Sequence, residues 1–466
     1  MWATGSTATP RCTTSAASTR WKPTTAATGV DCLPARRPRE PPNGAIGLSH
    51  WPCENRTMIK PFLLLALTAL CAACNHRVPS STTTSDPSPA KPATAPLRIA
   101  TYNTSLYSNE AGGLIAELQG DSAHARKIAA VLQRVRPDLV LLNEFDFDPQ
   151  HRAADLFQQR YLQVAQPGGG TPLRYPYRYL APVNTGVPSG LDLDNSGRVG
   201  GDGRSRGNDA WGFGLHPGQY GMLVLSRYPI DAQAVRSFQL LKWSTLPGAL
   251  RPIDPTTRTS FYSDAVWAQL RLSSKSHWDV PVRTPLGVVH ALVSHPTPPV
   301  FDGAEKRNAA RNHDELALWR AYLDNADDSR RWLCDDNGTC GGLPADARFV
   351  ILGDLNNDPV DGAGRHQAIR ALIDHPRVLQ YPAPLSIGGP EKTAHYAAQG
   401  ITHAGDPHQV TGDFGPQAGT MRLDYVLPSR QFSLAGSGIF WPASSAPEAA
   451  IADGSDHHAV WVDVVW

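Results

Sequence analysis

The sequence predicts an α/β domain in which two β-sheets pack together and helices cover their outer faces. Predicted strands outnumber predicted helices, and several strands are uninterrupted apolar runs, which is typical of strands buried on both faces. The predicted helices carry their apolar residues on one face, as helices that cover a sheet do. A chain of 466 residues has room for two or three domains. The structured part nevertheless fits one large α/β unit.

The first 96 residues divide into three segments, none of which predicts a folded core. Residues 1–57 are rich in Thr, Ala, Pro and Arg without periodicity, so we expect an upstream extension that is disordered, with Met58 as the true start. Residues 58–74 combine a positive start with a short apolar run and small residues, which predicts a bacterial export signal. Residues 75–96 are rich in Ser, Thr and Pro and predict an extended linker.

The export signal leaves two interpretations open. Its pattern resembles a lipoprotein signal with Cys74 as the acylated residue, which predicts a membrane anchor on an outer-membrane or periplasmic protein. Cys71 lies where such signals usually carry leucine, so cleavage and full secretion is the alternative. The apolar run is too short for a bilayer span, which needs about 20 residues.

The predicted domain runs from residue 97 to residue 466 and alternates buried strands with helices. Apolar residues recur at helical spacing in three segments, and the first ends at a proline, which disfavours helix at the residue before it. The predicted helices are Asp121–Arg136, Glu305–Asp324 and Gly364–His375. The predicted strands are Leu97–Asn103, Pro137–Glu144, Gly221–Ser226, Val288–His295, Arg348–Leu352, Arg422–Leu427 and Ala459–Val465.

Several of these strands end in a polar side chain, and the clearest case follows the apolar run before Gly353. Asp354 and Asn356 come directly after that glycine. If the strand pleat continued through them, both side chains would lie on one side. Because active sites commonly lie at the carboxyl ends of strands, this pattern indicates an enzyme.

The ordered set of these polar residues resembles the motif series of the endonuclease/exonuclease/phosphatase superfamily, which has the DNase I-like fold. The resemblance covers about 370 residues, from Leu97 to Trp466. It implies a four-layer sandwich, with two packed mixed β-sheets flanked by α-helices. The residues that carry it are Asn103, Glu144, His295, Gly353-Asp354-x-Asn356, Asp424 and Ser455-Asp456-His457.

The resemblance implies a divalent metal site. Glu144 matches the family's metal-binding glutamate, and Asn103 and Asp456 would complete the metal shell or orient its waters. Hard oxygen ligands of this kind suit Mg²⁺, with Mn²⁺ as the alternative.

The resemblance also implies the catalytic roles. Asn356 would hold a phosphoryl oxygen, and Asp424 would fix the tautomer of His457. His457 then activates water or binds the phosphate, with Asp354 as the rival base. His295 would contact the phosphate and protonate a leaving oxygen.

One departure from the family pattern bears on the substrate. In the nuclease branch, the histidine that matches His295 pairs with a glutamate from the strand near residue 220. This chain has Gly218-Gln219-Tyr220-Gly221 at that position. The departure weakens the case for nuclease-type acid catalysis.

A long insertion before residue 221 contains a partial calcium-loop pattern. Asp192, Asp194, Ser196 and Gly197 match positions one, three, five and six of such a loop, but position twelve is Gly203 and not glutamate. A bound Ca²⁺ in the Asp192–Asp194 loop, a plain glycine-rich turn and a substrate contact all remain open. Further along the chain, Cys334 and Cys340 flank a short polar loop and are placed to form a disulfide in an exported protein.

Charge helps to rank the substrate classes. Residues 1–74 hold 8 basic and 3 acidic side chains, so 35 basic and 39 acidic side chains remain in the rest of the chain. Lys and Arg do not cluster there, as they usually do on a duplex-binding surface. The sequence therefore predicts a monomeric, exported phosphoesterase that acts on phosphate mono- or diesters. An extracellular endonuclease with a nucleic-acid substrate is the alternative, and a non-catalytic binding module on the same fold is a third hypothesis.

Overall fold

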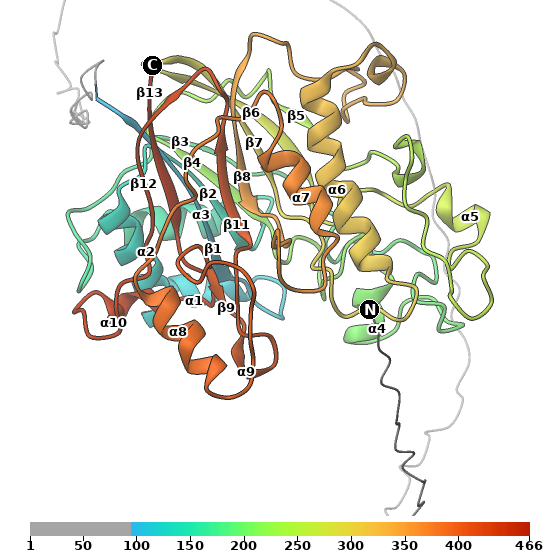
Figure 1. The fold of residues 1–466 in the computed structure, drawn as a ribbon, viewed down its shortest axis with the longest axis horizontal. Helices are drawn as coiled ribbons and strands as arrows, with labels where there is room; N and C mark the ends of the chain where they lie inside the picture. Colours follow the sequence, from blue (N-terminus) through green and yellow to red (C-terminus); the bar gives the residue numbers. More distant parts are fainter. Residues whose placement is uncertain (1–94) are drawn as a thin grey trace, which may run out of the picture. The chain divides into compact units, whose positions relative to one another are not determined.

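The computed structural model describes residues 95–466, and all statements on structure below refer to that part of the chain (Figure 1). Two larger β-sheets dominate it. The six-stranded sheet has the order β12-β13-β1-β2-β4-β3, and the five-stranded sheet has the order β11-β8-β7-β6-β5. The strands of the first sheet are β1 (Leu97–Leu106), β2 (Leu139–Phe145), β3 (Tyr177–Tyr179), β4 (Met222–Ser226), β12 (Ser433–Ile439) and β13 (Val460–Val465). Those of the second are β5 (Arg236–Ser237), β6 (His277–Thr284), β7 (Gly287–Ser294), β8 (Arg348–Asp354) and β11 (Asp424–Pro428).

Both sheets are mixed. Strand β1 runs parallel to β2 and antiparallel to β13, while β7 runs parallel to β8 and β8 antiparallel to β11. The carboxyl ends of β1 and β2 therefore lie at one edge of their sheet, and those of β7 and β8 lie at one edge of theirs. This arrangement brings the strand-end side chains of the sequence together.

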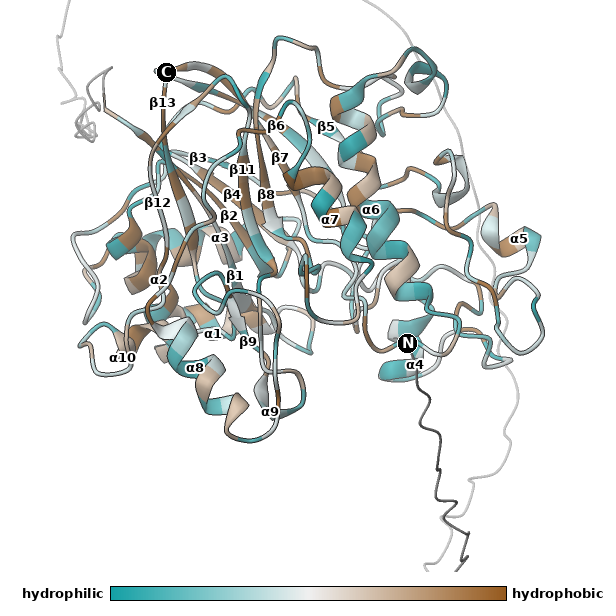
Figure 2. Cartoon of the chain, viewed as in Figure 1, coloured by the Kyte–Doolittle hydropathy of each residue, from teal (hydrophilic) through white to brown (hydrophobic). Residues whose placement is uncertain are grey.

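Every second residue of the central strands faces the other sheet, and the residues between them face the helices. In β1, for example, Ile99 packs in the core between the sheets, whereas Ala100 packs against the helical layer. Both faces of the sheets are therefore apolar, as the brown central strands of Figure 2 show. This explains why the strands are continuous apolar runs in the sequence.

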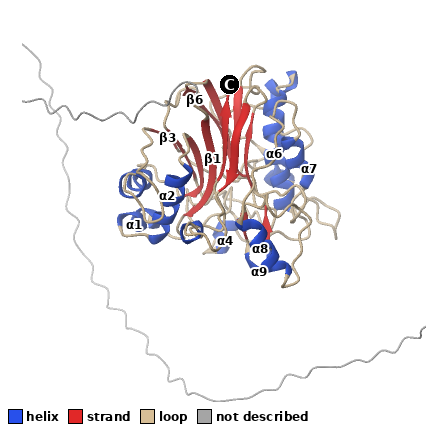
Figure 3. Ribbon diagram, turned by 60° about the vertical axis from the view of Figure 1, so that its left-hand side comes forward, coloured by secondary structure: helices blue, strands red, loops and turns tan. Residues whose placement is uncertain are grey.

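Helices cover the outer face of each sheet, so the layers follow the order helix, sheet, sheet, helix (Figure 3). Helices α1, α2 and α3 pack on the six-stranded sheet, and α6 and α7 pack on the five-stranded sheet. The predicted four-layer α/β sandwich is confirmed. The helices are α1 (Gly113–Gln119), α2 (Ala123–Val135), α3 (Arg152–Leu156), α4 (Arg204–Asn208), α5 (Asp264–Trp267), α6 (Arg307–Asp324), α7 (His366–Ile373), α8 (Gly388–Ala397), α9 (Gly415–Ala418) and α10 (Ala449–Ala452).

The three predicted helices form close to their predicted bounds. The side chain of Ser122 accepts a hydrogen bond from the Ala125 backbone and caps α2, and Arg136 ends that helix in a left-handed conformation just before Pro137. Cys334 and Cys340 form the disulfide that their spacing predicts. No helix in residues 95–466 has both the length and the apolar character needed to cross a membrane.

A small flap lies next to the C-terminal strand. It consists of β9 (Gly412–Asp413), α9 and β10 (Thr420–Met421), with β9 paired antiparallel to β10. Gly412 forms a backbone bridge with His457, and the backbone N–H of Asp413 donates to the Asp456 carbonyl. The sequence analysis did not predict this flap, which is bound directly to a candidate site segment. The export signal, the lipid anchor on Cys74 and the upstream extension all fall outside the described residues.

Candidate functional site

The two sheets meet at a cluster of polar side chains, as the strand ends predict. The Asn103 side-chain amide, at β1, donates a 3.0 Å hydrogen bond to Asp354 Oδ2 at the end of β8. The Asp354 backbone N–H donates in turn to Asn143 Oδ1 on β2, also at 3.0 Å. These bonds cross from one sheet to the other and fix Asp354, which is 1% exposed, at the junction.

Glu144 and His295 lie beside Asp354. His295 Nε2 is 3.4 Å from Asp354 Oδ2 and 4.0 Å from Glu144 Oε1. Glu144, the last residue but one of β2, has φ of 55°, a left-handed conformation that is uncommon outside glycine. The surrounding protein raises the pKa of Glu144 to about 7 by desolvation, against the lowering effect of the Asn103 hydrogen bond. The strained backbone and raised pKa are typical of functional sites.

These side chains fit a divalent cation. Ligand atoms of Glu144, His295 and Asp354 all lie within 4.8 Å of one another. Asp456 is exposed and lines the same cavity as Glu144. Because a cation would offset the desolvation of the two inner carboxylates, and because oxygen donors prevail, the set suits Mg²⁺ or Mn²⁺. The structure adds Asp354 to the predicted ligands, while the side chain of Asn103 is already occupied in part by Asp354 and by the Ser105 backbone.

The predicted carboxylate–histidine pair is formed. His457 Nδ1 lies 2.8 Å from Asp424 Oδ2, and the Thr411 hydroxyl donates to the same oxygen at 2.7 Å. The opposite ring nitrogen of His457, Nε2, lies 3.6 Å from Asp354 Oδ2. Burial disfavours the charged imidazole, but the carboxylates of Asp424 and Asp354 outweigh it and raise the pKa of His457 well above its usual value.

Asp354 therefore lies between two imidazoles. Burial alone would raise the pKa of its carboxyl group, but the charge of His457 and the hydrogen bond with His295 lower that pKa below its usual value. An ionised carboxylate at this position can hold a proton-bearing group in place or accept a proton itself.

Asn356 reaches the cavity by a different route from the one predicted. Strand β8 ends at Asp354, and Asn356 has φ of 52°, so the pleat does not continue through it. Its backbone N–H donates to Asp354 Oδ1, and its side-chain amide donates to the Pro296 carbonyl. The prediction that strand alternation places Asp354 and Asn356 on one side was wrong, although both side chains line one cavity.

His295 has no carboxylate partner from the segment near residue 220. Its Nδ1 atom has no hydrogen-bond partner among the described residues, and burial followed by the charge of Lys275 lowers its pKa to about 4. In place of the glutamate, the amide of Gln219 donates to the Ser108 carbonyl, and Tyr220 packs against the Tyr107 ring at 4.5 Å. The sequence-based inference that this chain lacks the nuclease-type pair is consistent with this geometry.

Sequence reasoning missed two charged residues near the site. Lys275 is 5% exposed, and its charge interacts with Glu315, Glu144 and Asp354. Glu315 extends from α6, and its two oxygens accept from the backbone N–H groups of Ser274 and Thr297 at 2.6 Å each. The only sequence signal was a lysine directly before a buried strand, which alone is compatible with an exposed position.

A cavity of about 590 Å³ opens onto these side chains. Its catalytic side is formed by Glu144, Asp354, Asn356, Asp456 and His457. Its other walls come from the segment after His295, from residues 361–364 and from the flap. The cavity is large enough for an organic molecule as well as a phosphoryl group.

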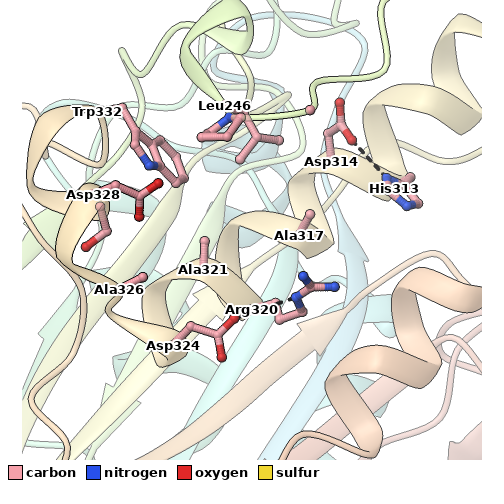
Figure 4. Close-up of a pocket in the computed structure, with 13 residues that line it drawn as sticks. Leu246, His313, Asp314, Ala317, Arg320, Ala321, Asp324, Ala326, Asp328 and Trp332 are labelled. Carbon is pink, nitrogen blue, oxygen red and sulfur yellow. Dashed lines mark hydrogen bonds and ion pairs between the residues drawn. The ribbon is translucent and has the colours of Figure 1, made fainter.

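A second hollow of about 290 Å³ lies on the outer side of α6 (Figure 4). His313, Asp314, Arg320 and Trp332 are among its lining residues, and none of the predicted site residues reaches it. Its polar groups pair with each other, as the dashed line between His313 and Asp314 shows.

The insertion loop carries a further acidic group. Asp192 and Asp194 lie with the buried Asp209 so that one oxygen of each falls within 4.8 Å of the others. Asp209, however, already accepts backbone N–H bonds from Leu193 and Gly200. The loop is thus compatible both with a bound Ca²⁺ and with a turn whose carboxylates are hydrogen-bonded within the loop. The sequence analysis did not predict Asp209 as a member of this group.

A comparison with protein-family models decides the family. The model described as the Endonuclease/Exonuclease/phosphatase family matches residues 100–457. The chain belongs to this family. Members of the family are generally hydrolytic phosphoesterases. The comparison with curated proteins gave no match to this chain.

Several solved structures are similar to this chain at low identity. An endonuclease/exonuclease/phosphatase from Beutenbergia cavernae has 20% identity and a TM-score of 0.41, with 79% of this chain and 71% of the other covered. Sphingomyelinase C from Streptomyces griseocarneus has 17% identity and a TM-score of 0.39, with 79% and 99% covered. A mannosyl-6-phosphatase from Bacteroides thetaiotaomicron has 14% identity and a TM-score of 0.37, with 79% and 100% covered.

Proposed function

We propose that this protein is a metal-dependent phosphoesterase that hydrolyses phosphate mono- or diesters by attack of an activated water. The observation that carries the proposal is the position of Asp354 between His295 and His457 and beside Glu144, where the two sheets meet. A single buried carboxylate that contacts two imidazoles in an open cavity serves no evident structural need. Such an arrangement can orient a water molecule for in-line attack on a phosphoryl group.

Each side chain has a role in the proposed reaction. Glu144 would hold the cation, together with Asp354, Asn103 or Asp456, and the bound cation would supply charge neutralisation at the phosphoryl oxygens. The side-chain amide of Asn356 faces the same cavity and would orient one of those oxygens.

The two histidines and Asp354 would orient the attacking water and transfer protons in the reaction. Asp424 holds His457 through Nδ1, which leaves Nε2 directed at Asp354 and the cavity. The protonated His457 and the Asp354 carboxylate would orient the attacking water, and Asp354 would take its proton. His295, on the other side of Asp354, would donate a hydrogen bond to the leaving oxygen.

Hydrolysis assays test this proposal. The purified protein would be given 4-nitrophenyl phosphate, bis(4-nitrophenyl) phosphate and supercoiled plasmid, each with Mg²⁺, Mn²⁺, Ca²⁺ or a chelator. We expect metal-dependent release of 4-nitrophenolate that is lost in Asp354→Asn and His457→Gln, with plasmid left intact. Plasmid nicking lost in the same variants would make the protein a nuclease, and no metal-dependent hydrolysis of any substrate would refute the proposal.

We also propose that the protein acts outside the cytoplasm, anchored through Cys74. The signal-like pattern of residues 58–74 and the Cys334–Cys340 disulfide support this, since disulfides persist in oxidising compartments. Cell fractionation of the full chain and of Cys74→Ser tests it. We expect the unchanged chain in membranes and the variant in the soluble exported fraction, whereas cytoplasmic protein in both cases would refute export.

A further inference from the structure

The cavity beside the catalytic side chains has two apolar walls from distant parts of the sequence. One is the segment Pro298–Phe301, which follows His295, and the other is the flap, with Phe414 and Met421. The ring of Phe414 meets that of His457 nearly edge to face, with centroids 5.2 Å apart. The apolar surface thus begins directly at the catalytic imidazole.

The flap wall is held in place by close approaches to glycine. A Cβ atom on Gly412 would lie 2.4 Å from the Phe414 ring, and one on Gly362 would lie 2.8 Å from the sulfur of Met421. A side chain at either position would require the Phe414 ring or the Met421 side chain to shift. The two glycines therefore leave room for the apolar side chains of this wall.

The opposite wall leaves apolar side chains open to solvent. Phe301 is 76% exposed and Val300 is 39% exposed. Phe301 also has φ of 61°, a strained conformation for a bulky residue. Strain that persists at the rim of a catalytic cavity is consistent with a ligand contact.

The charge of the cavity excludes a second phosphate. Outside the catalytic set, the charged residues that line it within the described chain are Asp358, Asp361 and Asp413, and neither Lys nor Arg is among them. Asp413 is neutralised by Lys392 at 2.8 Å, whereas the Asp361 oxygens accept backbone N–H groups of Ala404 and Gly405 and have neither Lys nor Arg beside them in the part of the chain that the structure describes. The nearest basic side chain to Asp361 there is His403, whose Nδ1 lies 3.9 Å from Asp361 Oδ2. An additional anionic group of the substrate, away from the catalytic side chains, would thus meet a carboxylate with neither Lys nor Arg to bind it.

We propose that this cavity selects an ester with a single phosphoryl group and an apolar, non-anionic organic group, which lies between the flap and the Pro298–Phe301 segment. The inference rests on the proposed function for where the phosphoryl group binds. It narrows the substrate class by excluding polyphosphates and nucleic acids. Phe414 and Met421 are the specificity-determining residues of the apolar wall, and Asp361 is the one that rejects anions.

Binding of non-hydrolysable phosphonates tests the inference without relying on turnover. Dissociation constants for methylphosphonate, hexylphosphonate and 5-carboxypentylphosphonate would be measured by calorimetry on the Mg²⁺-loaded full chain. Hexylphosphonate should bind at least about tenfold more tightly than methylphosphonate, because its chain removes apolar surface from water. It should also bind at least about tenfold more tightly than the carboxylate of nearly equal length.

Matched variants test which residues produce the preference for the hexyl group and the discrimination against the carboxylate. Phe414→Ala and, from the other strand of the flap, Met421→Ala should each reduce the ratio of the methyl to the hexyl dissociation constant at least about threefold. Tyr177→Ala, which truncates an exposed aromatic on β3 away from the cavity, should leave that ratio unchanged. Asp361→Asn should reduce the discrimination against the carboxylate, whereas Asp254→Asn, at a comparable turn outside the cavity, should not.

The outcomes separate this inference from the proposed function. Equal affinity for the methyl and hexyl compounds, or tighter binding of the carboxylate, would overturn the inference even if the protein hydrolyses esters. The expected preferences in a protein that hydrolyses none of the assayed esters would refute the proposed function and leave the binding preference established. A preference that survives in Phe414→Ala and Met421→Ala alike would also overturn the inference.

Discussion

The catalytic cavity and the α6 hollow both have histidine and aspartate side chains, but these side chains differ in whether their buried polar atoms have hydrogen-bond partners. In the α6 hollow, Asp314 Oδ2 accepts from the Trp243 indole and the Leu250 backbone, and Oδ1 lies 2.8 Å from His313 Nδ1. Beside the catalytic cavity, His295 Nδ1 and Asp424 Oδ1 have no hydrogen-bond partner within the described residues, and both side chains contact residues that line the cavity. Buried polar groups are normally paired, so the unpaired ones distinguish the chemical site from the structural one.

The two hollows also differ in backbone strain, which is found at the catalytic cavity. Glu144 and Asn356 at the catalytic cavity both have positive φ, whereas no residue lining the α6 hollow other than Gly248 does, within the described chain. Such conformations cost about 1–3 kcal/mol each for residues with a side chain. At Asn356, hydrogen bonds to Asp354 and Pro296 hold the residue in this conformation.

The largest expected effect comes from exchanging one carboxylate in each hollow. Asp354→Asn should lower kcat/KM about 10³-fold or more, because it removes the charge that orients both imidazoles, with little loss of thermal stability. Asp314→Asn should do the reverse and lower the free energy of unfolding by about 2 kcal/mol, because a buried acceptor that serves two donors is disturbed. Initial rates and denaturant melts on both variants measure the two effects.

One outcome for these two variants would contradict the prediction. If Asp314→Asn lost as much activity as Asp354→Asn at a temperature where both stay folded, the α6 hollow would belong to the functional site. The comparison between the two hollows would then fail.

Cation removal should affect only the catalytic cavity. A chelator should abolish hydrolysis and lower the thermal midpoint, since a ligand present at 100 times its dissociation constant stabilises by about 2.7 kcal/mol. Glu144→Gln should melt at the same temperature with and without Mg²⁺, because the expected ligand is absent. A Mg²⁺-induced rise in the midpoint of Glu144→Gln equal to that of the unchanged protein would place the ion elsewhere, with the Asp192 loop as the next site to test.

Lys275 provides a finer distinction between activity and stability. Burial lowers the pKa of its ammonium group, while the carboxylates of Glu315 and Glu144 favour its charged form. Lys275→Met keeps the length and removes the charge, so it should lower kcat/KM about tenfold, which corresponds to about 1.4 kcal/mol. The variant should be at least as stable as the unchanged protein, since it no longer buries an ammonium group. Unchanged kinetics in Lys275→Met would assign the lysine a structural role only.

The sequence predicted local features well and long-range ones poorly. The strand before Gly353, the helix that ends before Pro137 and the disulfide all depend on neighbours within a few residues, and each formed as predicted. That Asn103, Glu144, His295 and Asp354 form one site was implied by the family resemblance, with their positions at strand ends as support. The chemical roles of these residues remain predictions.

The missed features depend on residues far apart in the chain. Glu315 contacts Ser274 across 41 residues, and Asp209 joins the Asp192 loop only because the insertion folds back on itself. The left-handed turn at Asn356 follows from bonds to Asp354 and Pro296, which no pattern of alternating polarity contains. Short elements such as those of the flap have too few residues to give a periodic signal.

The smallest expected effect concerns a buried histidine of the structural core. His277 contacts Ser273 Oγ through Nδ1 and the Glu315 carbonyl through Nε2, and burial lowers its pKa to about 4. The unfolded chain, with an ordinary histidine pKa near 6.5, therefore takes up the proton first as the pH falls. The contribution of His277 is present above pH 6.5 and is lost toward pH 4, with about 1 kcal/mol lost between pH 6.5 and 5.5. Denaturant melts across this range should show a shallower pH dependence for His277→Asn than for the exposed control His395→Asn, and identical slopes would mean that His277 keeps an ordinary pKa in the fold.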